Sequence, residues 1–189
     1  MPFSEAQSYQ VLNTNIKNIQ TPLTSAAIEK LRSSDVVCLS GTIYTARDQA
    51  HKLIVEMIEK GKKLPFDISG QIIYYCGPTE PGYKGHAGSC GPTTSSRMDK
   101  YVPALLKLGL KGMIGKGKRS PEVVKSIMAN RAIYFAAPAG MGALVGKSVV
   151  RRELVAFKEL GPEAVYRFEI KDMLLVVVND IKGNNLYRF

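Results

Sequence analysis

The sequence predicts an α/β fold in which several strands run parallel. In the middle of the chain, short apolar runs typical of buried strands alternate with segments whose apolar residues recur at helical spacing. Apolar residues make up 45% of the 189 residues, which is enough to fill one core. Strands that alternate with helices favour a largely parallel sheet covered by helices. Because no repeat or linker divides the chain, we assign residues 23–189 to a single domain, preceded by a polar, irregular N-terminal arm over residues 1–22.

The first half of the chain is expected to contain a helix, a strand, a helix and a strand. A short helix capped by Thr24 or Ser25 runs to residue 32 and precedes a buried strand over residues 35–39. A second helix is predicted by apolar residues at helical spacing, namely Ala50, Leu53, Ile54, Met57 and Ile58. Gly61 closes this helix, and residues 71–76 form the next strand.

The second half is expected to begin with a glycine-rich loop over residues 79–91. A helix then starts near Thr94 and is kinked or split at Pro103. Another helix starts at Ser120 and Pro121, with serine as the cap and proline at the first position. Three further strands are expected, over residues 110–114, 132–137 and 174–178. A tight turn is predicted over residues 138–142.

Charge and motifs exclude several classes of protein. The net charge of +10 suits an anionic metabolite or an acidic partner. The basic residues are scattered, however, and no stripe of aromatic and basic residues indicates nucleic-acid binding. Residues 140–148 resemble a phosphate loop, but Gly140 leaves five residues and Gly142 three before Gly-Lys-Ser, where the motif requires four. This argues against a nucleotide triphosphatase.

The remaining compositional features predict a soluble cytoplasmic protein. No apolar run approaches the roughly 20 residues needed to span a bilayer, and the N-terminal residues do not resemble a signal peptide. Three cysteines are present, Cys38, Cys76 and Cys90, and none forms a Cys-x-x-Cys pair. We therefore expect reduced thiols and no metal bound by this chain.

Three loops that follow strands carry cations, over residues 41–48, 91–97 and 115–120. In α/β folds, ligands bind at these strand ends. The planar fork of Arg47 and of Arg97 matches a carboxylate, so the two residues can hold the ends of a small dicarboxylate. The alternative is two surface arginines on separate helices.

Other residues of these loops leave a similar choice open. Residues 91–96 combine free backbone N–H groups with hydroxyls, which suits either an anion or an ordinary helix cap. Lys116, between two glycines, is either solvated or reaches for an anion. His51 lies one turn after Asp48 and is either a base oriented by that carboxylate or part of a structural pair.

Five motifs in order carry a resemblance to a known family: residues 41–51, 74–78, 88–99, 113–117 and 179–187. Together they resemble the β subunit of class I, iron–sulfur fumarate hydratases and the related tartrate dehydratase β subunit. The match runs from about residue 20 to the end of the chain, and its most specific part is Gly-Pro-Thr-Thr-Ser-Ser-Arg-Met-Asp. The resemblance implies a swivelling β/β/α domain of layered sheets and helices for residues 23–189.

The resemblance also implies a hydro-lyase made of two kinds of subunit. This chain would act with an α subunit that holds a [4Fe–4S] cluster through its own three cysteines, so the three cysteines here would not be cluster ligands. The implied reaction is the reversible hydration of fumarate to (S)-malate. A tartrate dehydratase β subunit is the alternative, and a non-catalytic anion-binding or assembly module is a third. Residues 112–117 and 183–187 look more like the fumarases.

The family implies a role for each matching residue. Arg47 and Arg97 would bind the substrate carboxylates, and Lys116 would add a third cation. Thr93 would help to move the proton at the carbon next to a carboxylate. Three further residues would support the substrate-binding residues: Asp48, His51 and Thr94. The sequence departs from the family pattern over residues 136–146.

Overall fold

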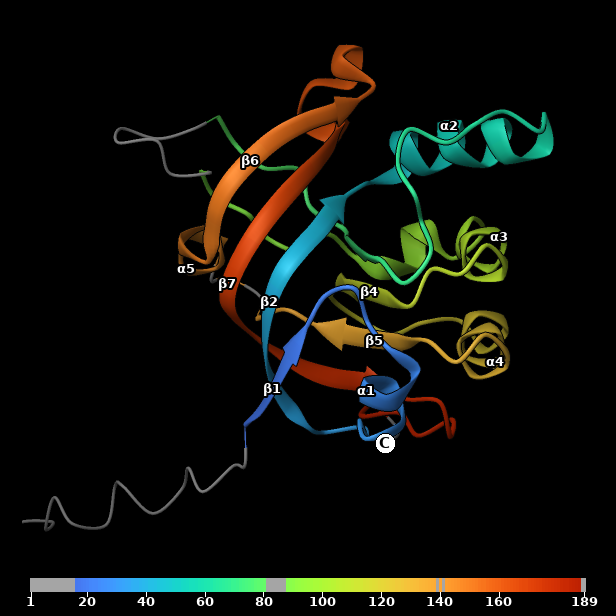
Figure 1. The fold of residues 1–189 in the computed structure, drawn as a ribbon, viewed down its shortest axis with the longest axis vertical. Helices are drawn as coiled ribbons and strands as arrows, with labels where there is room; N and C mark the ends of the chain where they lie inside the picture. The colour runs from blue at the N-terminus through green and yellow to red at the C-terminus, as the bar shows by residue number, and fades with distance from the viewer. Residues whose placement is uncertain (1–15, 81–87, 139, 141, 188–189) are drawn as a thin grey trace, which may run out of the picture.

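The computed structural model describes residues 16–80, 88–138, 140 and 142–187, which form a seven-stranded sheet with helices packed on it (Figure 1). The strands are β1 (Lys17–Gln20), β2 (Val36–Thr45), β3 (Ile72–Tyr74), β4 (Gly112–Gly115), β5 (Ile133–Ala136), β6 (Val149–Ala156) and β7 (Val165–Asn179). The helices are α1 (Ser25–Glu29), α2 (Asp48–Glu59), α3 (Val102–Lys107), α4 (Pro121–Ala129) and α5 (Gly142–Lys147). The segments η2 (Ser95–Met98) and η3 (Lys158–Glu163) are 3-10 helices. In these ranges, no helix is long and apolar enough to cross a membrane.

The sheet is partly parallel and closes on itself. Its order is β1-β2-β3-β4-β5-β7-β6, and the strands from β1 to β5 are parallel neighbours. The long strand β7 runs antiparallel to β5, β6 and β2. Hydrogen bonds therefore lead from β2 through β3, β4, β5 and β7 back to β2. The expected α/β class, with a partly parallel sheet and the layered β/β/α arrangement implied by the resemblance, is confirmed.

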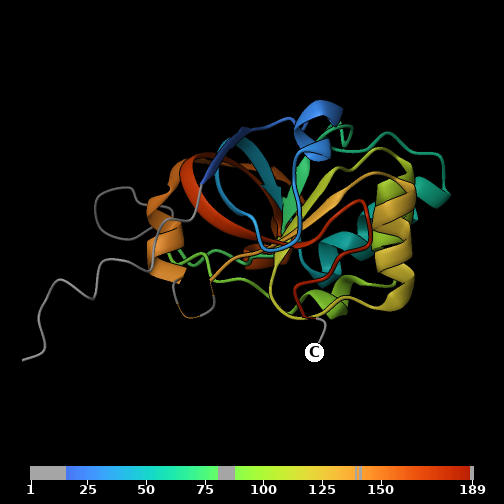
Figure 2. The same ribbon diagram turned by 90° about the horizontal axis from the view of Figure 1, so that it is seen from below.

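Two apolar cores lie on the two faces of the strands, because successive side chains point to opposite faces. In β3, Ile72 and Tyr74 join the core enclosed by the strands. Ile73 and the following Tyr75 join the core beneath the helices. Helices α2, α3 and α4 stand in a row on one side of the strands, and α5 lies on the opposite side (Figures 1 and 2). Helices α2 and α4 begin where the loops that follow the parallel strands β2 and β4 end.

The helix caps predicted from the sequence are confirmed. The Thr24 hydroxyl accepts a hydrogen bond from Ala27 N–H at 3.2 Å and caps α1, which ends at Glu29 rather than at residue 32. Ser120 caps α4 by accepting from Val123 N–H at 3.3 Å. The expected helix after residue 94 is split into η2 and α3, with proline in the first turn of α3.

Several expectations for the N-terminal part were wrong. Residues 17–20, which we assigned to an irregular arm, form the edge strand β1, in which Ile19 is buried. Residues 1–15 lie outside the described residues, so the boundary of the arm stays a prediction. The strand expected to end at residue 39 continues to Thr45. Gly41 lies within this longer strand, with a φ of 111° and a shift in register against β7. Only glycine fits there, because a Cβ would lie 2.5 Å from Thr21 Oγ1.

The C-terminal part contains more regular structure than expected. The elements β6 and α5 were not predicted, and β7 has 15 residues where a strand over residues 174–178 was expected. The strand expected over residues 71–76 is confined to β3. The turn expected over residues 138–142 includes Ala139 and Met141, which lie outside the described residues.

Candidate active site

The three cationic loops meet at one edge of the sheet. Strand β2 leads into Arg47, β3 into Cys76, and β4 into Lys116. Because β2, β3 and β4 are parallel neighbours, their carboxyl ends lie side by side. The structure therefore brings together loops that are far apart in the sequence.

The segment that contains Thr93 is hydrogen-bonded between the ends of β3 and β4. Thr93 N–H donates to the Tyr75 carbonyl at 2.6 Å, and Pro92 forms a bridge with Cys76. On the other side, Lys116 N–H donates to the Thr93 carbonyl at 3.3 Å. The exposed Thr94 forms a parallel bridge with Lys116. These bonds make Thr93 and Lys116 neighbours across a short ladder.

Arg47 stands at the N-cap position of α2, where its side chain provides no cap. Glu163 of η3 caps the helix instead, because its Oε2 accepts a hydrogen bond from Gln49 N–H at 3.1 Å. The same carboxylate lies 3.2 Å from the Arg47 Nη2 atom. A Cβ at Gly77 would lie 2.9 Å from Arg47 Nη1, so the guanidinium packs against the chain just after β3. Arg47 therefore points from the start of α2 toward the chain just after β3, which is hydrogen-bonded to Thr93.

Arg97 forms a forked pair with Asp48, the first residue of α2. Arg97 Nε donates to Asp48 Oδ1 at 2.9 Å, and Arg97 Nη2 lies 2.8 Å from Asp48 Oδ2. The carboxylate at the start of this helix is thus paired with an arginine side chain. The pair ties η2 to the start of α2 and holds Arg97 near Arg47. Arg97 remains half exposed, with 49% of its side chain accessible.

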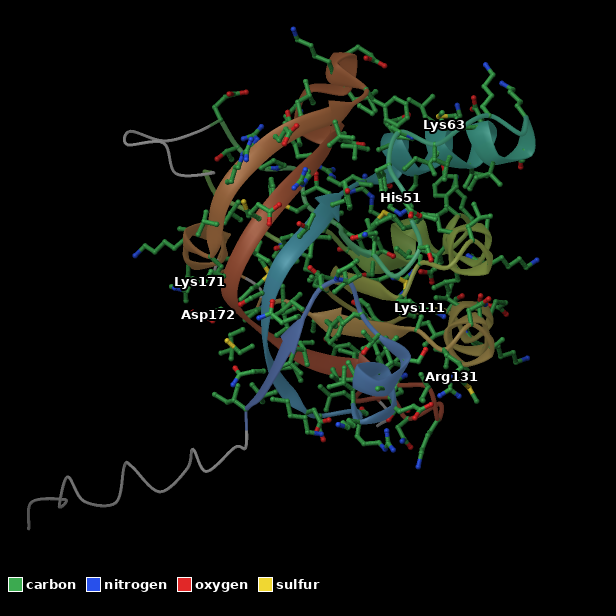
Figure 3. All side chains as sticks on the ribbon, viewed as in Figure 1. His51, Lys63, Lys111, Arg131, Lys171 and Asp172 are labelled. Carbon is green, nitrogen blue, oxygen red and sulfur yellow. The ribbon has the colours of Figure 1, made fainter. Side chains whose placement is uncertain are left out.

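His51 is fully buried, on the inner side of α2 (Figure 3). Its Nδ1 lies 2.9 Å from the Arg47 carbonyl, which can only accept, so Nδ1 carries the proton. Nε2 has no hydrogen-bond partner among the described residues. Burial lowers the pKa of His51 to about 4. The ring contacts the Arg47 backbone and the edge of Tyr75 rather than the Asp48 carboxylate, which favours a structural role.

Lys116 differs from the two arginines in its electrostatic surroundings. Arg47 and Arg97 are each paired with a carboxylate, whereas the exposed Lys116 ammonium has no hydrogen bond or ion pair in the described part of the chain. It borders an open pocket of about 610 Å³. The pocket is also lined by Thr94, Gly117, Ala136, Ala137, Pro138, Val176, Leu186 and Tyr187. An anion entering this pocket would meet an uncompensated positive charge.

The sequence did not point to two features of this edge. One is Glu163, whose pairing with Arg47 depends on a 3-10 segment from the other end of the chain. The other is Arg119, which we did not distinguish from the other scattered basic residues. Its side chain is fully buried, lies 2.8 Å from Asp99 Oδ1, and donates to the Tyr75 hydroxyl at 3.1 Å.

The described residues do not fit an iron–sulfur cluster held by three cysteines. Cys38 lies beside Asp172, which is on the side of the sheet away from His51 (Figure 3). Cys76 donates a hydrogen bond to Cys90, which raises the pKa of the Cys76 thiol and lowers that of Cys90. No three His, Cys, Asp or Glu side chains converge within the described ranges. A cluster would therefore need ligands from elsewhere.

The chain is similar to known proteins over most of its length. The family model of the fumarase C-terminus matches residues 2–189. The chain is 41% identical over 171 residues to the "Putative L(+)-tartrate dehydratase subunit beta" of Methanocaldococcus jannaschii, covering 87% of this chain and 88% of that protein. It is 36% identical over 181 residues to the anaerobic class I fumarate hydratase of Escherichia coli, covering 94% of this chain and 32% of that protein. With fumarate hydratase 2 of Leishmania major the identity is 39% over 155 residues, 80% of this chain and 27% of that one. The chain thus spans about a third of the fumarate hydratases it matches.

Proposed function

Because this chain belongs to the fumarase C-terminus family, we propose that it supplies the dicarboxylate-binding half of a hydro-lyase, a class I fumarate hydratase that hydrates fumarate reversibly to (S)-malate. The family resemblance expected from the sequence motifs is confirmed by these matches. The observation that carries the proposal is that Arg47, Arg97 and Lys116 belong to loops at the carboxyl ends of the neighbouring strands β2, β3 and β4.

The cations would bind the two carboxylates of the substrate. Lys116 is available without competition, so one carboxylate would pair with it in the open pocket. The other would meet the guanidinium groups of Arg97 and Arg47, which Asp48 and Glu163 hold in place. A carboxylate-bound cation also stabilises the negative charge that develops when the adjacent carbon loses a proton. This is the step that distinguishes a hydro-lyase from a passive binding module.

Thr93 would move the proton at that carbon. It lies next to Lys116 in the ladder and its side chain is half-buried. A threonine hydroxyl is a weak base, so it needs a neighbouring group to accept its proton. We assign that group to a partner chain. Asp48, His51 and Thr94 would act indirectly, by holding Arg97, the Arg47 backbone and Lys116.

The partner would be an α subunit that carries the [4Fe–4S] cluster. Two observations support a partner: the chain spans about a third of the fumarate hydratases it matches, and one relative is named as a β subunit. The described cysteines do not converge on a site for three ligands. A cytoplasmic location for this assembly stays part of the proposal.

Tartrate is the second candidate substrate. The relative named as a tartrate dehydratase subunit has 41% identity and nearly the same extent as this chain, which favours it as an alternative. Both candidate substrates would use Arg47, Arg97 and Lys116 for their carboxylates. They differ in the hydroxyl groups that the rest of the site must accommodate.

Anaerobic co-expression with a cluster-bearing partner encoded in an adjacent reading frame tests the proposal. The reconstituted complex is assayed with fumarate, malate and tartrate, and the partner alone serves as the control. We expect turnover of fumarate and malate by the complex and none by the partner alone. Turnover of tartrate alone would select the second candidate. No turnover of any substrate by a complex with an intact cluster would reduce the chain to an assembly module.

A further inference from the structure

We propose that a buried brace made by Ser95, Tyr134 and the Gly117 carbonyl, backed by Arg119, positions Lys116 beside Thr93. The inference rests on the proposed function, because it assigns Lys116 to the substrate. None of the brace side chains is expected to touch substrate. They act through the main chain that carries the lysine.

Lys116 needs such a brace because its own side chain is not held. The ammonium has no partner in the described part of the chain, and a four-carbon stem is flexible. Its neighbours are Gly115 and Gly117, which restrict the backbone less than any other residue. The position of the ammonium is therefore set by how firmly the main chain of residues 115–117 is fixed.

The Tyr134 hydroxyl holds the main chain of residues 115–117 through a hydrogen bond. Tyr134 comes from β5, and its Oη lies 2.8 Å from the Gly117 carbonyl and 2.8 Å from Ser95 Oγ. The carbonyl can only accept, so the single proton of Tyr134 goes to Gly117. Ser95 must then donate to Tyr134. This order defines a relay from Ser95 through Tyr134 to Gly117, in which each hydroxyl proton has one acceptor.

The same serine joins the relay to the ladder at Thr93. Ser95 N–H donates to the Lys116 carbonyl at 2.9 Å, and Lys116 N–H donates to the Thr93 carbonyl at 3.3 Å. Ser95 is fully buried and its hydroxyl packs directly over Gly115, where any Cβ would overlap it. Lys116 is thus held at its N–H, at its carbonyl and at the following carbonyl, and each bond leads to the 93–95 segment or to β5.

Arg119 holds the tyrosine ring in place. Its guanidinium carbon lies 5.1 Å from the centroid of the Tyr134 ring and 5.3 Å from that of Tyr75. Asp99 pairs with Arg119 and also accepts from Ser120 N–H at 2.7 Å, at the start of α4. The buried guanidinium therefore contacts both rings and a carboxylate that is itself bound to the start of α4. These contacts link the brace to the segment just after β3, to β5 and to the start of α4.

Tyr134→Phe tests the inference, because it removes one hydroxyl and keeps the ring under Arg119. Its matched control is Ser33→Ala, which deletes a hydroxyl that donates to the Val178 carbonyl at 3.0 Å, away from the relay. Amide hydrogen exchange on the full chain is the first measurement. We expect exchange at Lys116 and Ser95 to rise about ten-fold in Tyr134→Phe and to stay unchanged in Ser33→Ala. Unchanged exchange at both amides would overturn the brace, whatever the activity.

A double-mutant cycle in the reconstituted complex is the second measurement. With Lys116 present, Tyr134→Phe should raise the KM for the dicarboxylate about five-fold and change kcat less. With Lys116→Met in place, the same change should alter KM by less than about two-fold, since the brace acts through the lysine. An equal effect in both backgrounds would show a general structural role and refute the positioning. A wild-type complex without turnover would contradict the proposed function, and the exchange result would still decide the brace.

Discussion

Replacing His51 by asparagine should remove part of the acid sensitivity of this fold. Burial lowers the pKa of His51 to about 4 from its ordinary value of 6.5. Between these two values the unfolded chain binds a proton that the folded chain does not, so stability falls as the pH drops from about 6.5 to about 4. The difference between these two pKa values corresponds to about 3 kcal/mol. Asparagine does not titrate, and its amide can still donate to the Arg47 carbonyl.

The measurement is the free energy of unfolding in urea at several pH values between about 7 and about 4. The wild-type protein should lose about 3 kcal/mol more than His51→Asn over this range. The lowered pKa values of Glu169 and Asp180 also cost stability in acid, but both proteins share them and they cancel. Parallel pH profiles for the two proteins would refute the assignment of His51 as a buried neutral residue.

Three further predictions follow from the contacts around the site. Arg119→Met leaves the largely buried Asp99 carboxylate without its partner and should destabilise the fold by about 3 kcal/mol in urea unfolding; a loss below about 1 kcal/mol would contradict the role of this ion pair. Gly115→Ala places a methyl group against Ser95 Oγ and should lower the melting temperature less in a Ser95→Gly background than in the wild-type protein; an equal loss in both backgrounds would contradict the packing. Asp48→Asn releases Arg97 and should cost less than about 1 kcal/mol of stability, because the pair is partly exposed, while the KM for the dicarboxylate rises; an unchanged KM would separate this pair from substrate binding.

The sequence predicted the elements whose local signals are strong. Ser120 followed by Pro121 marks the start of α4, and the apolar spacing from Ala50 onward marks α2. These elements frame the parallel strands, so the loops that carry Arg47 and Lys116 could be assigned to one edge. Their meeting at that edge follows from the parallel order of the sheet, which the alternation of strands and helices implies.

The C-terminal strands could not be predicted because their side chains show no simple alternation. Strand β6 is exposed along much of its length and carries Arg151, Arg152 and Glu153 in succession, which resembles a loop. Only the second half of β7 is rich in apolar residues, so only that half was expected. Helix α5 contains Gly142 and Gly146, which are poor helix formers. Tertiary pairing decides the structure at these positions.

At this edge of the sheet, the placement of the cations could be predicted from the sequence, whereas their carboxylate partners could not. Arg47 was identified from its place before a helix, but its pairing with Glu163 depends on a contact between distant elements. Arg119 lies near two lysines in the sequence, a pattern typical of solvated side chains. The fold instead buries it between the rings of Tyr75 and Tyr134. Buried charges of this kind are visible only once the partner is known.

The comparison of Lys116→Met with Lys118→Met in the reconstituted complex tests the central claim most directly. Both lysines are exposed and belong to the same short loop, so the two variants remove the same charge from nearly the same place. A charge-assisted contact to the substrate predicts that kcat/KM falls by about ten- to one-hundred-fold in Lys116→Met and stays near the wild-type value in Lys118→Met. Equal values of kcat/KM for the two variants would contradict the account, because the edge of the sheet would then bind no substrate carboxylate through Lys116.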